Sequence, residues 1–225
     1  AGNNDGWGSS ADHAINEKFQ FRLIAKLPAS SDRAYDYYDN YTVRFTDTLS
    51  EGITFDNLDT VEITNGDGGA SQVITDTHYE LGKNGLPSSF KLSIDNVKTC
   101  AAAAGLNLND GATITVTYTA HLNENATVNT AYGPNTTENK NSVYLQYSNN
   151  PRIDTSLDQT TTSEVRVYTY QLNNTKYRDE VNENNKLEGA GFRLYSDEAC
   201  TPEQEVKLYK KDNFYYPIKD ATDKA

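Results

Sequence analysis

The chain has 225 residues, and 32 acidic side chains against 20 lysine and arginine side chains give it a formal net charge of −12. Such a charge repels nucleic acids and anionic membranes, and no basic cluster offsets it. The 16 tyrosines and 7 phenylalanines, with many threonines and valines, favour half-buried strands. The length allows one large domain or two small ones, and the spacing of the turns favours two.

The two cysteines, Cys100 and Cys200, lie far apart in the sequence. Because they fall in different predicted domains, we expect isolated thiols rather than a disulfide. We find no signal peptide, sorting tail or apolar run of membrane-spanning length, and both ends look cut from a longer protein. Abundant Asn, Asp, Thr and Ser without methionine is a pattern common in extracellular bacterial repeats.

Alternation of apolar and polar residues, the pattern of a half-buried strand, recurs along the first 150 residues. A second and a third strand are expected to pair with each other across a turn at Gly52. One short helix is predicted between Asp95, a candidate N-cap, and Gly105, a candidate stop. The strands predicted in this region cover residues 19–27, 41–47, 53–55, 61–63, 73–79, 90–94, 114–120 and 143–147.

We interpret residues 1–163 as one antiparallel β-sandwich. The chain turns polar around Pro151, and a new alternation begins at Val165. Residues 164–225 are therefore interpreted as a second unit, which is too short to close a sandwich of its own. The predicted fold class is all-β, with two Ig-like antiparallel β-sandwich domains in tandem, the second incomplete.

Counting by two along the strands places polar side chains on predicted core faces. Asp47 continues the buried row that contains Phe45, and Asn141 and Asn149 continue the row of 143–147 in its two directions. A buried carboxyl group without a partner is costly and tends to keep its proton. Two interpretations are open: the strands end here and the side chains reach solvent, or the acid and an amide form a buried reactive set.

The second interpretation has a chemical consequence. A neutral buried lysine can attack the carboxamide of an asparagine, while a protonated acid polarises the carbonyl group and carries protons as ammonia leaves. Burial favours each step, because desolvation lowers the pKa of the lysine, raises the pKa of the acid and holds the reactants in contact. The product is a Lys–Asn isopeptide bond.

Three segments carry a family resemblance: TDTLSEGITF (46–55), VTYTAHLNE (116–124) and NSVYLQYSNNP (141–151). In this order they resemble the fimbrial isopeptide-formation domain, of Cna A-like type, of sortase-assembled Gram-positive backbone pilins. Two later segments, VYTY (167–170) and LEGAGFRLY (187–195), resemble the start of a collagen-adhesin (Cna protein) B-type domain.

The resemblance implies that Asp47 is the proton-shuttling acid and that Asn141 is the acyl partner, with Asn149 as the alternative. It places the lysine of the first unit upstream of Ala1, on the strand that precedes WGSSAD (7–12).

Other lysines are weighed against this placement. Lys18 lies on the polar face of its strand and Lys26 near a strand end, so both are expected to be solvated. In the second unit the resemblance makes Lys176 the nucleophile, with its acid and asparagine beyond Ala225. A solvated lysine at a strand end is the alternative for Lys176.

The resemblance further implies a structural shaft subunit of a secreted, cell-wall-anchored surface pilus that takes part in adhesion. Its partners would be neighbouring pilin subunits and sortase, with a host glycan or extracellular matrix as a further ligand. We expect no membrane insertion and no enzymatic turnover, since no Gly-x-Ser-x-Gly elbow, phosphate loop or Cys–His pair is present. No cofactor is expected, and the scattered histidines His13, His78 and His121 predict no metal site.

A competing hypothesis is an adhesin or carbohydrate-binding β-sandwich module at the cell surface. It would use an exposed apolar or aromatic patch, for which the tyrosine-rich run at 35–41 is the candidate. Packing of these tyrosines in the core and at strand edges is the alternative. A third hypothesis, the accessory domain of a secreted enzyme, requires a catalytic domain elsewhere in a parent chain.

Overall fold

A computed structural model describes residues 1–3, 6–69, 71–83, 85–128 and 138–219. The described chain consists mainly of strands, which confirms the predicted all-β class. Its one α-helix, α1 (Val97–Ala103), begins after Asn96, whose side chain accepts a hydrogen bond from the Lys98 backbone N–H. The N-cap is thus one residue later than predicted. No described helix is long and apolar enough to cross a membrane.

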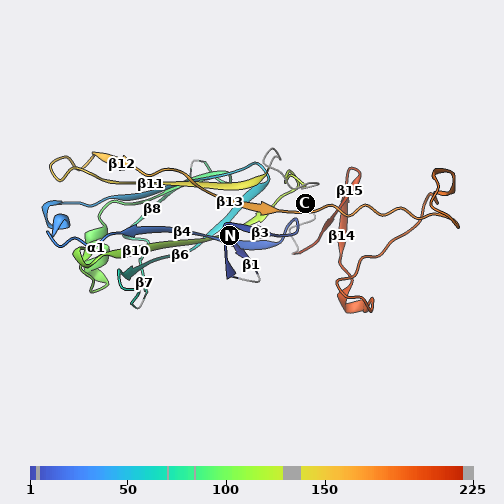
Figure 1. Cartoon of the computed structure of the whole chain (residues 1–225), viewed down its shortest axis with the longest axis horizontal. Coiled ribbons are helices and arrows are strands. Elements are labelled where there is room, and N and C mark those ends of the chain that lie inside the picture. The colour runs from blue at the N-terminus through green and yellow to red at the C-terminus, as the bar shows by residue number, and fades with distance from the viewer. Residues whose placement is uncertain (4–5, 70, 84, 129–137, 220–225) are drawn as a thin grey trace.

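Two sheets form an elongated sandwich, whose strands run along the long axis of the molecule (Figure 1). The first sheet contains, in spatial order, β4 (Lys18–Leu27), β10 (Ala112–Leu122), β6 (Ile53–Asn65) and β7 (Gln72–Val73). The second contains β3 (Ser10–Asp12), β13 (Ser163–Tyr168), β11 (Asn139–Ser148), β5 (Val43–Leu49), β9 (Ser89–Ile94) and β8 (Glu80–Gly82), with β12 (Leu157–Gln159) also paired to β11.

Alternation along the strands builds the core between these sheets. In β4 the residues Phe19, Phe21 and Leu23 are buried and the residues between them are exposed, as predicted. Strand β10 buries every second residue along its eleven positions. Because β10 pairs with β4 on one side and β6 on the other, it places its buried row at the centre of the first sheet.

The chain changes sheet at the turn that contains Gly52. The prediction that the second and third strands pair with each other is wrong: β5 pairs with β9 and β11, whereas β6 pairs with β10 and β7. A Cβ atom at Gly52 would lie 2.5 Å from both Ala126 Cα and Asn139 Oδ1, so this crossing requires glycine. Residues 53–65, predicted as two strands, form one long strand. The register of its pairing with β10 shifts between Thr117 and Tyr118 and again between Thr119 and Ala120.

Strand β13 was expected to begin the second unit, but it lies in the second sheet of the sandwich. It pairs antiparallel with β11 and parallel with β3, and Val167 is fully buried. The sheet is therefore not antiparallel throughout. The alternation that begins at Val165 predicts the strand β13, but alternation identifies only the buried face of a strand and not its partner strand. The division into 1–163 and 164–225 stays a prediction.

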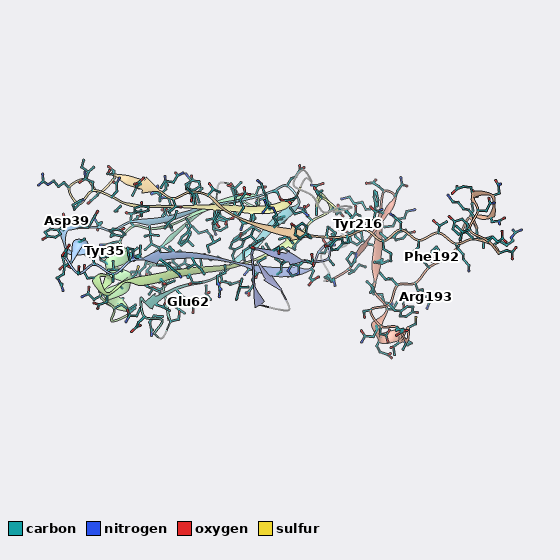
Figure 2. The ribbon with its side chains drawn as sticks, viewed as in Figure 1. Tyr35, Asp39, Glu62, Phe192, Arg193 and Tyr216 are labelled. Carbon is teal, nitrogen blue, oxygen red and sulfur yellow. The ribbon has the colours of Figure 1, made fainter. Side chains whose placement is uncertain are left out.

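Residues after Thr169 have a different character, since none of those described up to residue 219 is buried. Apart from short 3-10 segments, their regular structure is one hairpin, β14 (Leu208–Lys211) and β15 (Phe214–Pro217). Phe192 lies on an extended arm, 57% exposed (Figure 2). Cys200 in this region is exposed and Cys100 in the sandwich is buried, and both are free thiols, as predicted.

The hairpin contacts the end of the sandwich through polar groups. Asn16 Nδ2 donates to the Pro217 carbonyl at 3.1 Å, and the Tyr209 hydroxyl donates to Glu124 Oε1 at 2.6 Å. Lys211 forms an ion pair with the same carboxylate. Tyr216 stacks on Tyr209, and Figure 2 shows it beside the sandwich. Because this region lacks buried side chains, the Glu124 contacts are expected to hold the hairpin in place.

A charge exchange tests this contact. Glu124→Lys removes the acceptor for Tyr209 and places two cations side by side, so the hairpin should move relative to the sandwich. Adding Lys211→Glu should restore the ion pair. The distance distribution between spin labels at Ser71→Cys and Asn213→Cys, in a Cys200→Ser background, should broaden in the single variant and narrow again in the double variant.

The exposure of the Glu124 contact limits how far Glu124→Lys can shift the hairpin, and the neighbouring Lys210 offers a control. Exposed ion pairs contribute little, so the docked state should lose no more than about tenfold in population. Lys210→Glu makes the same charge change at the adjacent hairpin position, where the side chain lies over the Tyr215 ring, and should leave the distribution narrow. An unchanged distribution in Glu124→Lys would rule out this contact as the one that positions the hairpin.

Candidate functional site

The candidate site lies inside the sandwich and is built from one residue on each of three strands. Asp47 on β5 has no exposed surface, so the hypothesis that it reaches solvent at a strand end is wrong for this residue. It lies within the ladders that β5 forms with β9 and β11, opposite Phe90 and Val143. Counting by two along the strand therefore placed Asp47 correctly.

Asn141 on β11 faces the same interior and is 3% exposed. Its neighbours across the sheet are Leu49 on β5 and Val165 on β13. The competing candidate, Asn149, is exposed beyond the end of β11, where its side chain accepts a hydrogen bond from Ser156 Oγ at 2.7 Å. Burial therefore favours Asn141 over Asn149 as the amide of a buried site.

Tyr118 connects the other two residues from the opposite sheet. Its hydroxyl donates to Asp47 Oδ1 at 3.1 Å and accepts a hydrogen bond from Asn141 Nδ2. The ring has no exposed surface and lies on β10, the strand at the centre of the first sheet. Three polar side chains from two sheets thus meet in the core, where no solvent reaches them.

Aromatic rings enclose this polar group. Phe90 packs edge-on against Tyr118 with ring centroids 5.1 Å apart, and Phe21 and Phe55 lie 5.4 Å from it. Phe90 is also the neighbour of Asp47 across the ladder between β5 and β9, so apolar surface adjoins a carboxyl group that water would otherwise solvate. The surroundings therefore penalise a negative charge on Asp47.

The protonation states follow from this burial. Desolvation raises the pKa of Asp47 to about 7, although the neighbouring polar groups of Asn141 and Tyr118 act in the opposite direction. Burial also raises the pKa of Tyr118 well above its usual value, and the neighbouring Asp47 adds to this effect. A substantial fraction of Asp47 is consequently protonated near neutral pH, and Tyr118 stays neutral.

Two polar atoms in this group lack a hydrogen-bond partner among the described residues: Asp47 Oδ2 and Asn141 Oδ1. Asn139, two residues earlier on the same strand, provides a contrast. Its Oδ1 accepts a hydrogen bond from the Thr127 backbone N–H, and its Nδ2 donates to the carbonyl groups of Thr127 and Val167. Both polar atoms of the Asn139 side chain therefore have partners. Asn139 is a structural amide, whereas Asn141 retains a free carbonyl oxygen in contact with the acid's hydrogen-bond network.

None of the described lysines is buried. Lys18 and Lys26 are exposed on the outer face of β4, as predicted, so neither side chain reaches Asn141. Lys176 is also exposed, and its expected acid and asparagine partners lie outside the described residues. The structure thus unites the predicted acid and the predicted amide, while the nucleophile stays a prediction.

Other candidate sites received less support. Within the described ranges, no group of three or more His, Cys, Asp and Glu side chains could hold a metal ion. In the tyrosine-rich run, Tyr35 and Tyr38 pack edge-on against Tyr41, with centroids 4.9 and 5.1 Å apart. Tyr35 and Tyr41 are buried, which supports the packing interpretation over a glycan platform, although Tyr37 is 73% exposed.

Sequence reasoning missed Tyr118 as a member of the site. It was counted among the apolar residues of its strand because it occupies a core-facing position between Val116 and Ala120. The available signal was its hydroxyl group, which needs a partner when the ring is fully buried. The predicted burial of Asp47 and Asn141 supplied two such partners.

The raised pKa of Asp47 predicts a pH dependence of stability. Between the unfolded value of 3.8 and the folded value of about 7, the folded chain keeps a proton that the unfolded chain loses. The free energy of unfolding should therefore decrease as pH rises through this interval, by on the order of 4 kcal/mol from this group alone. Urea unfolding of the wild type and Asp47→Asn across pH 4.5–7.5 measures it.

Asp47→Asn cannot ionise, so the variant should lack this contribution, and its stability relative to wild type should increase with pH. Asp158→Asn, on the exposed edge strand β12, is the control and should parallel the wild type. A stability difference between Asp47→Asn and wild type that does not change with pH would mean that Asp47 titrates normally.

Comparison with known proteins identifies the fold. A family model described as Gram-positive pilin backbone subunit 2, Cna-B-like domain matches residues 25–151, more than half of the chain. The Cna-B-like description falls on the first sandwich, whereas we expected the B type for the second unit. The assignment of an isopeptide-formation domain to the first unit and of a B-type domain to the second stays a prediction. No curated protein sequence gives a significant match.

One of the similar solved structures shares this fold at a TM-score above 0.5. The 35 kDa C-terminal fragment of the major pilin GBS80 of Streptococcus agalactiae aligns with a TM-score of 0.62 at 17% identity, over 90% of this chain and 63% of that one. The pilus backbone protein RrgB of Streptococcus pneumoniae aligns with a TM-score of 0.44 at 25% identity, over 62% of this chain and 44% of that one. The major pilin SpaD of Corynebacterium diphtheriae aligns with a TM-score of 0.48 at 18% identity, over 81% of this chain and 39% of that one. The chain spans less than two thirds of each neighbour.

Proposed function

Because this chain belongs to the family of Gram-positive pilin backbone subunits, we propose that it is a load-bearing segment of a pilus shaft whose first sandwich is closed by a Lys–Asn isopeptide bond. The observation that carries the proposal is the buried pair of Asp47 and Asn141, each with one oxygen atom left unpaired among the described residues. Unpaired buried polar atoms are costly, and a lysine ε-amino group would supply a partner to both.

The site has the chemistry that such a bond needs. The proton on Asp47 lets it donate to the carbonyl oxygen of Asn141, which makes the carboxamide carbon more electrophilic. The apolar surroundings would hold an entering lysine in its neutral, nucleophilic form. A reaction within one folded chain also benefits from fixed geometry, which replaces a bimolecular encounter. The lysine is proposed to come from the strand that precedes Ala1.

The proposed bond has a mechanical purpose. By analogy with a disulfide that closes a long loop, it would stabilise the sandwich by on the order of 4 kcal/mol. Its larger effect under tension is kinetic, because a covalent tie blocks extension beyond the linked residues. This accounts for how a secreted shaft can resist force although both described cysteines are free.

The remaining parts of the proposal concern context. We place the segment in an extracellular, cell-wall-anchored pilus assembled by sortase, with neighbouring pilin subunits as partners and a part in adhesion. The second unit would carry its own isopeptide bond through Lys176. Its exposed apolar side chains, among them Leu172 and Phe214, agree with a β-sandwich whose remaining strands are not in the described residues.

A binding module is the second candidate function. Exposed aromatic residues favour it, chiefly Tyr37 and Trp7. The Trp7 ring is, however, covered by the Arg22 guanidinium 4.4 Å from its centroid, and the neighbours of Tyr37 are packed inward. The shaft function therefore has the better structural support.

Intact mass tests the bond on a chain extended upstream of Ala1. The extended wild type should be lighter than its sequence by the mass of one ammonia, because the Asn141 nitrogen leaves when the bond forms. Asn141→Ala removes the acyl carbon and Asp47→Ala the acid, so both variants should have the full sequence mass. Asn149→Ala is the matched control and should keep the loss.

The outcomes are distinct. A loss that disappears in Asn149→Ala and persists in Asn141→Ala would transfer the acyl role to Asn149. A wild-type mass that equals the sequence mass would exclude a self-formed bond in the first sandwich and would favour the binding-module function.

A further inference from the structure

The hydroxyl group of Tyr118 lies between the two side chains that take part in the proposed reaction. It donates to Asp47 Oδ1 at 3.1 Å and accepts from Asn141 Nδ2. Nδ2 is the atom that departs as ammonia when the isopeptide bond forms. A hydroxyl bonded to both an acid and a leaving nitrogen is placed to pass a proton from one to the other.

We propose that Tyr118 is a catalytic residue of bond formation, which relays a proton from Asp47 to the departing nitrogen of Asn141. The inference rests on the proposed function, since it concerns the same reaction. It assigns the protonation of the leaving group to a residue that is neither the acid nor a reactant.

The step balances as follows. The lone pair of a neutral lysine amine forms a bond to Asn141 Cγ while the π pair of the carbonyl moves to Asn141 Oδ1, and the amine loses one proton to Asp47 Oδ2, the oxygen without a partner. The Tyr118 hydroxyl turns from Asp47 Oδ1 toward Nδ2, so the 3.1 Å contact with Oδ1 reverses its direction. Asp47, with its original proton on Oδ1, gives that proton to Tyr118 Oη, and Tyr118 gives its own proton to Nδ2. The carbonyl then re-forms as the Cγ–Nδ2 bond breaks, the electron pair of that bond stays on nitrogen, and ammonia leaves. Asp47 and Tyr118 both end the step neutral.

Both hydrogen bonds of the Tyr118 hydroxyl reverse their direction along this route. In the resting structure Nδ2 donates to Tyr118, so it has no lone pair to accept a proton. Once the amine adds to Cγ, Nδ2 becomes a tetrahedral amine whose lone pair can accept the Tyr118 proton across the same contact. Bulk solvent does not reach this contact, because Asp47 and Tyr118 have no exposed surface and Asn141 is only 3% exposed.

The environment also keeps Tyr118 suited to a relay. Phe21, Phe55 and Phe90 pack against its ring at centroid distances of 5.1 to 5.4 Å and limit its movement. Burial raises the pKa of its hydroxyl, so the phenol is present with its proton before the reaction. A relay needs only a concerted exchange of protons, and no buried phenolate forms.

Another buried tyrosine shows what a purely structural hydroxyl looks like in this fold. Tyr35 is 6% exposed, and its hydroxyl donates to the Pro28 carbonyl at 3.0 Å. It lies at the end of the sandwich away from the hairpin (Figure 2). Tyr35→Phe therefore removes a buried tyrosine hydrogen bond without touching Asp47 or Asn141, and it provides the matched control.

The test compares rates of bond formation in the chain extended upstream of Ala1. Newly made chains from pulse-labelled translation are sampled over time, and the fraction that has lost ammonia is measured by intact mass. Tyr118→Phe keeps the ring but removes the relay, so the rate should fall by about 10²-fold, the lower range for loss of a general acid. Tyr35→Phe should form the bond at the wild-type rate.

A second variant separates catalysis from folding. 3-Fluorotyrosine at position 118 keeps the ring and the hydroxyl but makes the phenol more acidic, which should change the rate while leaving the unfolding temperature of unreacted chains near that of the wild type. A structural hydroxyl would show no rate change. This variant decides the question if Tyr118→Phe fails to fold, as judged by circular dichroism.

The outcomes distinguish the inference from the function on which it rests. If the wild type forms the bond and Tyr118→Phe forms it equally fast, the relay is wrong and the proposed function stands. If the wild type never loses ammonia, the proposed function fails and takes the relay with it. A slow Tyr118→Phe with a normal Tyr35→Phe supports both.

Discussion

The carboxyl group of Asp47 lies between two sheets that exclude water, and most features of the site depend on this desolvation. Burial of Asp47 raises its pKa to about 7 and leaves its proton available for donation. The same surroundings would keep an entering lysine uncharged. The proposed chemistry would therefore depend on closure of the sandwich, because an open sheet would solvate the acid and restore its ordinary pKa. Folding would come first and bond formation second.

The position of Asn141 suits a load-bearing link. Its strand, β11, lies inside the second sheet and hydrogen-bonds β5 on one side and β13 and β12 on the other. These strands run along the long axis of the sandwich (Figure 1), so a pull along that axis loads their ladders in shear. A covalent tie at the buried face of β11 would hold the sheet at its interior strand, where separation would otherwise expose the core.

The sequence predicted faces more reliably than it predicted partners. Period-two alternation depends only on the local backbone, and it placed Asp47 and Asn141 on the core face. Pairing depends on how distant segments close, and the expected pairing across Gly52 and the expected unit of β13 both differ from the structure. Tyr118 was missed for another reason: a tyrosine fits an apolar row, and only a three-dimensional view shows what its hydroxyl meets.

The region after Thr169 shows the limit of local patterns. It belongs to the second unit that the alternation beginning at Val165 predicted, yet none of its residues described up to 219 is buried, so its apolar side chains gain little from packing. The hairpin must therefore be held by the hydrogen bonds between β14 and β15 and by the contacts of Tyr209 and Lys211 with Glu124. Polar contacts of this kind define position but supply little stability, since water competes for each group. The sandwich thus provides both the buried chemistry and the platform against which the hairpin is positioned.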